Sequence, residues 1–457
     1  MEQKTNVMVF DLDPRGETPR ARVKGTQTDP TLLTDALTPC LMEAAVSRDN
    51  MRAAFKRVKA NKGAPGIDGL TVDELGAHLK VAWPGTRQQL LAGTYVPQPV
   101  RRVTIPKPTG GVRNLGIPTV VDRLIQQALL QVLTPVFDPT FSDSSYGFRP
   151  GRSAHQALRA AKQYVAGGKT WVVDMDLEQF FDRVNHDLLM ARVARKVRDK
   201  TVLKLIRAYL NAGVMAGGVK TQTDTGTPQG GPLSPLLANI LLDDLDRELT
   251  KRGHSFCRYA DDCNIYVASQ RAGERVMAGV TDFVERKLKL KVNQKKSAVG
   301  RPVERKFLGL RVVASKEPYI SIAPQSLERF KKKVRKLTKR NRGVSLDHVI
   351  ADLNRYTTGW IYYFGIAKAK SIAQELDGWI RRRLRCYIWK QWKTWRCRVD
   401  HLLKAGVDLK LTYGIASGKH GPWKVALTQA MTIAVPNQYL ESLGYQSLYK
   451  RYMALSY

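Results

Sequence analysis

The stretch FCRYADDCNIYV (256–267) decides the fold of this chain. It places two adjacent carboxylates, Asp261 and Asp262, between two apolar segments whose β-branched and aromatic side chains are typical of strands. This pattern predicts a tight β-hairpin with the carboxylates at its turn. An isolated Asp-Asp pair is usually a turn or a helix cap, but two like charges side by side are unfavourable unless cations neutralise them. The other segments of the chain must decide between an ordinary turn and a metal site.

A second acidic cluster, DMDLEQFFD (174–182), ends a β-branched, strand-like segment. Carboxylates at the ends of two strands can flank a pair of Mg²⁺ ions about 3.5–4 Å apart, the arrangement that in-line phosphoryl or nucleotidyl transfer needs. Asp174 and Asp176 are both candidates, because residues two apart lie on the same face of a strand. The two clusters together therefore favour a metal site over an ordinary turn.

The composition indicates a polyanionic partner. Among 457 residues, 75 Lys and Arg stand against 40 Asp and Glu, which gives a formal net charge of +35. This surplus excludes most ordinary metabolic enzymes, while the 43% of hydrophobic residues is ample for packed domains. Because neutralised phosphates release condensed counterions, nucleic acid is the leading candidate partner and an anionic membrane is a weaker one.

The charge surplus is concentrated in a basic module near the C-terminal end. Residues 301–400 contain 25 Lys and Arg against 8 Asp and Glu, so 17 of the 35 surplus charges lie there. The runs KKKVRKLTKRNR (331–342) and WIRRRLRCYIWKQWKTWRCR (379–398) carry apolar residues at helical spacing and predict amphipathic helices. The aromatic residues on the apolar stripe of the second run are expected to pack in a core, with base stacking as the alternative.

The chain before this basic module is of mixed type. Helical spacing runs through VDRLIQQALLQVL (121–133) and SPLLANILLDDLDREL (234–249), whereas TWVVDMDL (170–177) and CNIYVAS (263–269) have the composition of strands. Interleaved helices and strands predict an α+β or α/β core, followed by an all-α basic module. Residues 1–45 are poorly patterned and are interpreted as an extension.

Targeting signals and disulfide patterns are not apparent. The start MEQKTNVMVFDLDPRGE lacks a basic segment followed by an apolar one, and the longest aromatic-apolar run, 360–367, is too short to span a bilayer. The five cysteines are scattered without a C-x-x-C pair, which favours a reducing compartment. We therefore expect a protein that is neither secreted nor membrane-spanning.

Taken together, these segments resemble a reverse transcriptase of the group II intron-encoded kind, a reverse transcriptase and maturase. The resemblance runs from about residue 50 to the C-terminal end. YADD (259–262) is similar to the family's catalytic hairpin, and DMDLEQFFD to its first catalytic block. The resemblance implies that Asp176, Asp261 and Asp262 are catalytic and hold two Mg²⁺ ions.

The spacing found in the family separates the two candidates of the first block. The family has an aromatic residue five positions after its metal ligand, and Phe181 stands five positions after Asp176. The resemblance therefore favours Asp176 and leaves Asp174 a structural part. Phe181 would lie beneath the incoming sugar and reject a 2′-hydroxyl, which selects deoxynucleotides; core packing is the alternative for this side chain.

Two further blocks are expected to bind the incoming dNTP. IPKPTGGVRNLGIPTVVDRLIQQAL (105–129) is similar to the family's fingers block, a hairpin in which Lys107 and Arg113 match the positions that hold the triphosphate. GTPQGGPLSPLLANILL (226–242) resembles the block in which a Pro-Gln-Gly turn precedes a helix. It places Gln229 beside the nascent base pair, and its two following glycines let the backbone approach the substrate closely.

The remaining blocks supply candidate nucleic-acid contacts. Four more segments resemble family blocks in the expected order, namely NKGAPGIDGLT (61–71), YGFRPGRSAHQAL (146–158), KLKVNQKKS (289–297) and KFLGL (306–310). The second of these resembles the template-contacting block, and in the third Lys291, Lys295 and Lys296 cannot be ranked. The candidate contacts are Arg149, Arg152, Lys295, Lys331, Lys332, Lys333, Arg335, Arg381, Arg382 and Arg383.

The fold implied by the resemblance is an α+β right-hand polymerase with fingers and palm, followed by an all-α basic thumb and maturase module. The expected parts are an N-terminal extension (1–45), fingers and palm (46–320), a helical thumb or maturase (X) domain (321–405) and a C-terminal maturase or DNA-binding-like segment (406–457). Many family members carry a zinc-dependent HNH endonuclease, whose cysteine pairs and histidines have no counterpart in this sequence. We therefore expect no second-strand cleavage by this chain.

The expected function is RNA-directed DNA polymerisation, combined with binding of a group II intron RNA as a maturase. Such a protein would assist splicing and intron mobility (retrohoming) by target-primed reverse transcription. Its expected partners are intron RNA, an RNA template with a DNA primer, target DNA and dNTPs, without a membrane, in a ribonucleoprotein of the bacterial cytoplasm or nucleoid. The alternatives are an RNA-binding splicing cofactor with incidental polymerase activity, or a domesticated intron-like reverse transcriptase in DNA repair or phage defence.

Overall fold

The computed structural model describes residues 40–106, 112–216, 219–221 and 230–455. These residues form two compact units that part between Arg301 and Pro302. The sequence pattern predicts this division later, after residue 320. The structure differs because β9 (Leu310–Val313) and β10 (Tyr319–Ile322) form a two-stranded sheet that belongs to the second unit. No helix of the described residues is long and apolar enough to cross a membrane.

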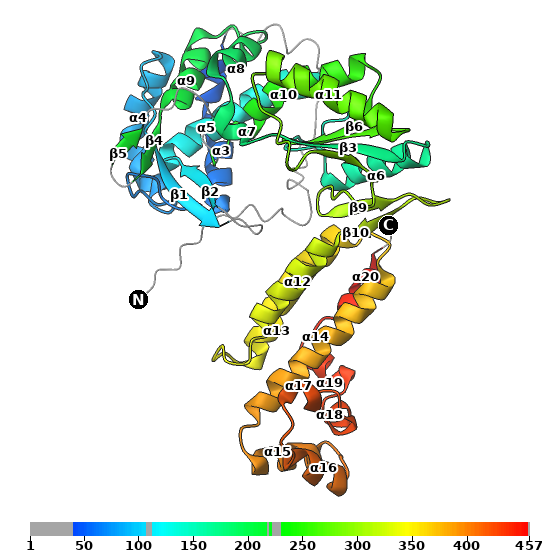
Figure 1. Cartoon of the computed structure of the whole chain (residues 1–457). Coiled ribbons are helices and arrows are strands. Elements are labelled where there is room, and N and C mark those ends of the chain that lie inside the picture. The colour runs from blue at the N-terminus through cyan, green and yellow to red at the C-terminus, as the bar shows by residue number, and fades with distance from the viewer. Residues whose placement is uncertain (1–39, 107–111, 217–218, 222–229, 456–457) are drawn as a thin grey trace, which may run out of the picture. The chain divides into compact units, whose positions relative to one another are not determined.

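The first unit contains a small sheet surrounded by helices (Figure 1). Its strand order is β2-β1-β4-β5, and β1 (Val100–Pro106) pairs antiparallel with β2 (Val112–Ile117) as predicted for the fingers block. β1 also pairs in parallel with β4 (Val214–Ala216), which pairs antiparallel with β5 (Val219–Thr221). The surrounding helices are α2 (Leu41–Ala45), α3 (Arg48–Asn61), α4 (Leu75–Leu91), α5 (Val120–Phe137), α8 (His186–Val193) and α9 (Lys200–Asn211).

A second sheet of the first unit, in the order β6-β7-β3-β8, carries both acidic segments. All its strand pairs are antiparallel, and successive residues of each strand point to opposite faces. One face, with the buried Val173 and Met175, packs against α10 and α11, and the other meets α6, where Cys257 Sγ lies 3.3 Å from Ala157 O. The elements are β3 (Trp171–Asp176), β6 (Ser255–Tyr259), β7 (Asp262–Val267), β8 (Ala298–Gly300), α6 (Ala154–Ala166), α10 (Ser234–Lys251) and α11 (Gln270–Lys287).

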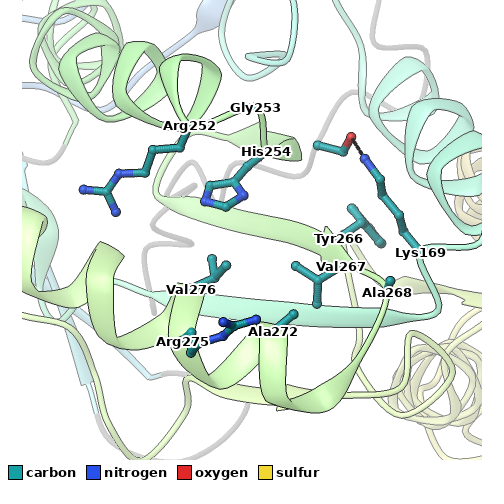
Figure 2. A pocket seen from close by; sticks show the side chains of 11 residues that line it. Lys169, Arg252, Gly253, His254, Tyr266, Val267, Ala268, Ala272, Arg275 and Val276 are labelled. Carbon is teal, nitrogen blue, oxygen red and sulfur yellow. Dashed lines mark hydrogen bonds between the residues drawn. The ribbon is translucent and has the colours of Figure 1, made fainter.

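A hollow of about 480 Å³ opens at one end of this second sheet (Figure 2). Its wall includes Ser255, the first residue of β6, and Val267, the last residue of β7, so it lies at the end of these strands away from Asp262. Burial, reinforced by two neighbouring cations that also line the hollow, lowers the pKa of His254. The hollow is therefore basic in character and is separate from the acidic segments.

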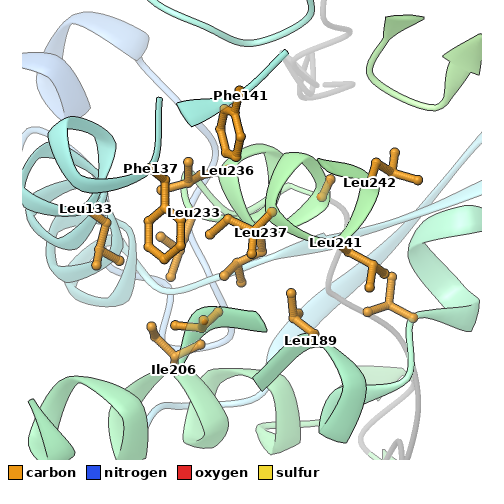
Figure 3. Close-up of a cluster of buried hydrophobic side chains, with 14 of the residues drawn as sticks. Leu133, Phe137, Phe141, Leu189, Ile206, Leu233, Leu236, Leu237, Leu241 and Leu242 are labelled. Atoms are coloured by element: carbon orange, nitrogen blue, oxygen red, sulfur yellow. The ribbon is translucent and has the colours of Figure 1, made fainter. Parts of the chain in front are cut away.

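One hydrophobic core runs through the first unit. Figure 3 shows Leu133 and Phe137 of α5 facing the leucines of α10, with Ile206 of α9 close by. The helical spacing predicted both α5 and α10, and the structure confirms these helices. α5 begins where Thr119 accepts a hydrogen bond from the backbone N–H of Asp122, as expected of an N-cap threonine.

The second unit is built mainly of helices. α12 and α14 confirm the helices predicted from the two basic runs, and the second run continues into α15 after Gln391. Phe330 of α12 is fully buried, and its ring centre lies 4.4 Å from that of Trp360 on α13. In the second run, Leu384 and Ile388 of the predicted stripe are buried, whereas Trp379 and Trp392 are partly exposed, so core packing of the aromatic residues of this stripe is not confirmed. The longer helices are α12 (Pro324–Leu337), α13 (Leu346–Phe364), α14 (Lys370–Gln391) and α15 (Trp395–Lys404).

The segment after residue 406 packs within this second unit. The Asp377 carboxylate of α14 is 1% exposed and accepts hydrogen bonds from the Tyr445 hydroxyl at 2.6 Å and the Leu448 N–H at 2.9 Å. It also accepts one from the Ser447 hydroxyl at 2.9 Å and pairs with Arg381. The remaining helices are α16 (Leu409–Ala416), α17 (Pro422–Val425), α18 (Gln429–Ala434), α19 (Asn437–Ser442) and α20 (Leu448–Ala454).

Candidate active site

The predicted hairpin is confirmed at residues 255–267. Tyr259 and Asp262 are the last paired residues of β6 and β7, so Ala260 and Asp261 form a two-residue turn between them. Ala260 has a φ of +58°, the left-handed conformation that two-residue hairpin turns require and that a residue with a Cβ adopts at some cost. The structure therefore places Asp261 in the turn and Asp262 at the start of β7.

The register of β3 and β7 brings the two acidic segments together. Asp176 and Asp262 are direct partners across these antiparallel strands, and Asp174 pairs with Asn264 one repeat further from the turn. Directly opposed residues point to the same face, with Cα atoms about 4.5–5.5 Å apart. The side chain of Asp176 is 40% exposed, so ions and substrate can reach it. Of the two candidates in β3, Asp176 is thus the one beside the turn.

A loop from the end of the unit fixes the position of Asp176. The Asp176 backbone N–H donates to Ser297 Oγ at 2.9 Å, and the Asn293 N–H donates to the Asp176 carbonyl at 2.8 Å. Leu177 forms an antiparallel bridge with Val292. These contacts hold the C-terminal end of β3 along the edge that does not pair with β7, and so fix the backbone that carries the carboxylate.

The same loop places a cation beside Asp176. Lys296 Nζ lies 3.4 Å from Asp176 Oδ2, and its side chain is 65% exposed. Lys291 contributes a backbone carbonyl to Glu178 N–H. Lys295, the residue selected from the sequence, is exposed, and the ion pair with Asp176 is made by its neighbour Lys296. The sequence shows three lysines in this loop, and only the folded loop shows which of them reaches the carboxylate.

Lys296→Ala is expected to lower kcat/KM for dTTP incorporation by about threefold, within the range for an exposed ion pair. The physical reason is that the ammonium balances the charge of Asp176 and can turn toward a substrate phosphate. Lys295→Ala is the matched control, and we expect it to change kcat/KM by less than about twofold. A larger loss in the Lys295 variant than in the Lys296 variant would contradict this assignment.

Two aromatic residues border the hairpin. The centre of the Tyr259 ring lies 6.1 Å from that of the Phe148 ring. Phe148 is 48% exposed, and its backbone has a φ of +57°, which is unfavourable for a residue with a Cβ. Burial raises the pKa of both Tyr259 and Cys263, so these groups stay neutral near pH 7. Sequence reasoning missed Phe148, and its place inside the YGFRPGR segment was the signal that could have found it.

Phe181 lies just beyond β3, on the short helix α7 (Phe180–Arg183). Phe180 is 2% exposed in the core, and the Phe181 ring packs edge-on against it with a centre distance of 5.1 Å. Phe181 itself is partly buried, so core packing accounts for one side of the ring and the other side stays accessible. The steric role against the sugar of an incoming nucleotide stays a prediction.

Phe181→Ala is expected to raise the incorporation of ribonucleotides relative to deoxynucleotides by about 10- to 100-fold, the range for a steric contact in a pocket. The measurement is the ratio of kcat/KM for UTP and dTTP on one template and primer. Phe181→Tyr keeps the bulk of the ring and should keep the selectivity. An unchanged ratio in the alanine variant would remove the steric role.

The donor set suits a magnesium site of the polymerase kind. Mg²⁺ prefers carboxylate oxygens and is held by one or two carboxylates with water and substrate phosphates, rather than by a cage of protein groups. Asp176 and Asp262 meet across the strands with Asp261 next to them. Within the part of the chain that the structure describes, no three His, Cys, Asp or Glu side chains form a ready-made metal cluster. Asp176, Asp261 and Asp262 supply carboxylate oxygens of the kind that Mg²⁺ would bind together with water and substrate phosphates.

Comparison with known proteins identifies the family. Residues 105–312 match the family model described as "Reverse transcriptase (RNA-dependent DNA polymerase)", and residues 327–406 match "Group II intron, maturase-specific domain". "Protein YkfC" of Escherichia coli (strain K12) is 34% identical in an alignment of 348 residues that covers 66% of this chain and 90% of that protein. The chain belongs to the group II intron-encoded reverse transcriptases.

This reverse transcriptase is also similar to a second curated protein and to a solved structure. "Group II intron-encoded protein LtrA" of Lactococcus lactis subsp. cremoris is 41% identical over 195 residues, 42% of this chain and 32% of LtrA. Among solved structures, the "Partial Cas6-RT-Cas1--Cas2 complex" matches with a TM-score of 0.36 and 24% identity, over 58% of this chain and 46% of that chain. The reverse transcriptase thus combines an RNA-directed DNA polymerase domain with a maturase domain.

Two residues of the expected dNTP site, Lys107 and Gln229, lie outside the described residues. Arg113 is described as a β2 residue opposite Ile105, without its side chain. The two glycines after Gln229 approach the protein's own backbone and side chains. A Cβ on Gly230 would lie 2.5 Å from Gly116 O, so the contact with β2 by itself excludes a side chain at this position.

The expected template contacts Arg149 and Arg152 have different surroundings. The Arg149 guanidinium is buried and donates to Asp138, both at its carboxylate (2.7 Å) and at its carbonyl (2.9 Å). It also donates to the carbonyls of Ser142 and Ser145, so its donors are used inside the protein and a nucleic-acid contact is not supported. Arg152 pairs with the exposed Asp143 and stays partly accessible.

The basic residues of α12 are candidates for RNA contact. Lys332 and Lys333 are exposed, and Arg335 is exposed with its guanidinium 5.7 Å from the Trp379 ring centre. Lys331 is half-buried and pairs with Glu375 at 3.2 Å. This helix therefore presents several cations to solvent while its apolar stripe faces the core.

Three of the four arginines of α14, Arg381, Arg382 and Arg383, make contacts within the second unit. Arg381 pairs with Asp377, and Arg382 donates to the Trp423 carbonyl at 2.8 Å with its guanidinium 3.7 Å from that ring's centre. Arg383 donates to Thr338 Oγ1. These contacts use part of the donors of each guanidinium, and the three residues remain partly exposed, so their expected RNA contacts stay a prediction.

Proposed function

We propose that this protein copies RNA into DNA by extending a primer 3′-hydroxyl onto the α-phosphate of a bound dNTP. The observation that carries the proposal is the strand register that sets Asp176 opposite Asp262, with Asp261 in the adjoining turn. Three carboxylates at one accessible edge of a sheet have no use in simple RNA binding. They suit a reaction in which charge develops on both the attacking and the leaving oxygen.

The residues around the carboxylates divide the remaining tasks. Asp176, Asp261 and Asp262 would hold two Mg²⁺ ions, which when bound lower the pKa of the primer hydroxyl and stabilise the leaving pyrophosphate. Phe181 would lie against the deoxyribose, and Lys296 would balance the charge of Asp176. In the fingers, Lys107 and Arg113 would bind the triphosphate, and Gln229 would lie beside the new base pair.

The test is dTTP incorporation on a poly(rA)/oligo(dT) duplex with Mg²⁺. The proposal predicts incorporation by the intact chain and none above background by Asp261→Ala. Absence of incorporation by a folded intact chain that binds the duplex would overturn the polymerase function. The duplex is a suitable probe because it supplies an RNA template and a DNA primer without any intron sequence.

The proposal extends to a group II intron RNA as the partner of the maturase domain. The match over residues 327–406 and the +17 charge of residues 301–400 support this partner. Bound intron RNA would be stabilised in its splicing-competent fold, and reverse splicing into target DNA would supply the primer for copying. We place this ribonucleoprotein in the bacterial cytoplasm or nucleoid.

RNA binding by this protein is expected to weaken steeply with salt, by about 10³-fold or more between 50 and 200 mM if six or more phosphates are neutralised. The reason is that each neutralised phosphate releases condensed counterions. The measurement is log Kd against log salt concentration for a structured RNA. The double variant Lys332→Ala/Lys333→Ala should reduce the slope of this plot by about one to two, because each lysine neutralises about one phosphate. A flat plot for the intact chain would contradict the electrostatic binding mode.

A further inference from the structure

We propose that a buried ion pair between Arg258 and Asp246 is a positioning device that sets the YADD turn for catalysis. This inference rests on the proposed polymerase function and assigns a part to residues outside the three carboxylates. Arg258 directly precedes Tyr259 in β6, and Asp246 lies on α10, which packs against the face of the sheet opposite the carboxylates. The pair thus links the catalytic edge to the core helix.

The ion pair is fully enclosed. Arg258 is 1% exposed and Asp246 is 0% exposed, so neither charge is solvated by water. The two groups meet in a bidentate arrangement, with Nε to Oδ1 at 2.7 Å and the terminal nitrogen to Oδ2 at 2.6 Å. Such a fork fixes the plane of the guanidinium as well as its position.

The other donors of the guanidinium hold the turn itself. One terminal nitrogen of Arg258 donates to the Ala260 carbonyl at 3.0 Å and to Asn239 Oδ1 at 2.9 Å. The Ala260 carbonyl belongs to the peptide bond that leads into Asp261. Because Ala260 sits in the left-handed region, this peptide needs an external contact to keep its orientation. Arg258 provides that contact from the core side.

A neighbouring segment closes the turn from its other side. The second terminal nitrogen of Arg258 donates to Ser145 Oγ at 2.7 Å, and the Tyr146 N–H donates to the Arg258 carbonyl at 2.8 Å. Asn239 donates in turn to the Gly147 carbonyl at 2.9 Å. A Cβ built on Gly147 would lie 2.4 Å from the Ala260 N, so this backbone touches the turn directly.

Fold stability alone does not explain this arrangement. Removing two charges from water is costly, and well-packed apolar residues in place of a buried ion pair often leave a protein equally or more stable. What the pair supplies is a fixed direction for the peptide before Asp261. A displacement of about 1 Å in a catalytic group can cost about 100-fold in rate. A fixed peptide orientation therefore matters more in a hairpin that carries catalytic carboxylates than in one that is only structural.

The test replaces both charges together, because a single replacement would leave the other charge buried and unpaired. The variant is Arg258→Met/Asp246→Leu, compared with the intact chain for melting temperature, duplex Kd, kcat and the Mg²⁺ concentration that gives half-maximal activity. We expect kcat to fall by about 100-fold and the Mg²⁺ requirement to rise, while the duplex Kd stays within about twofold. Unchanged kcat and Mg²⁺ requirement in a folded double variant would overturn the proposal.

A second variant decides the matter if the double variant does not fold. Gly147→Ala leaves the ion pair in place and pushes on the Ala260 nitrogen, so kcat should fall and the Mg²⁺ requirement should rise here too. Gly85→Ala, with no atom within 4 Å of the added Cβ, is the matched control and should keep full activity. Full activity of Gly147→Ala would overturn the proposal. An inactive intact chain would instead remove the polymerase function itself, which separates the two failures.

Discussion

Asp262→Asn is expected to reduce primer extension by at least about 1,000-fold, equivalent to about 4 kcal/mol of lost transition-state stabilisation. Asp262 is the direct cross-strand partner of Asp176, and the two carboxylates share one face of the sheet. An asparagine keeps the shape of the side chain but lacks the charge that divalent ions need. The measurement is dTTP incorporation on poly(rA)/oligo(dT) with saturating Mg²⁺.

The same substitution should leave RNA binding unchanged, because the proposed RNA contacts lie in the maturase domain. Binding of a structured RNA by the Asp262 variant serves as the internal check. Asp282→Asn on α11, an exposed carboxylate paired with Arg286, is the matched control and should keep its activity within about twofold. Loss of RNA binding together with polymerase activity would contradict the separation of the two functions.

Asp377→Ala is expected to lower the free energy of unfolding of the second unit by about 3–5 kcal/mol, because it leaves buried donors and a charged partner without their acceptor. The Asp377 carboxylate is 1% exposed and holds Tyr445, Ser447 and Leu448 against α14. For a unit of this size the corresponding fall in melting temperature is roughly 10 °C. Chemical denaturation and a thermal melt of the full chain measure both quantities.

An exposed carboxylate of the same unit provides the control for this prediction. Asp400 pairs with Lys404 on α15, and both side chains are more than half exposed. Asp400→Ala should therefore change the free energy of unfolding by less than about 1 kcal/mol. A loss below about 1 kcal/mol for Asp377→Ala would show that the C-terminal segment is not held in place by this carboxylate.

The acidic hairpin and the main helices could be predicted from the sequence because they depend on local patterns. Apolar, strand-like segments on both sides of YADD specify two strands and a short turn, and the spacing in residues 121–133 specifies α5. The choice between Asp174 and Asp176 was different in kind. Both lie on one face of β3, and the register with β7 sets Asp176 beside the turn.

The use of each basic residue could not be predicted from the sequence. Arg149 and Arg381–Arg383 have the residue type expected of nucleic-acid contacts, yet their guanidinium groups bind partners inside the protein. Lys296 and Lys295 are neighbours, and the turn between Asn293 and Ser297 directs one of them to Asp176. In a chain with 75 basic residues, type and composition cannot separate internal partners from external ones.

The sequence by itself determined the family, the acidic hairpin and the helices over residues 121–133 and 234–249, because all of these are recorded in short segments. The tertiary structure decided the pairing of Asp176 with Asp262, the enclosure of Arg258 by Asp246, and the docking of residues 445–448 on Asp377. Each of these joins residues that lie on different helices, strands or loops. The burial and direction of a charged side chain depend on such neighbours, so only the folded chain specifies them.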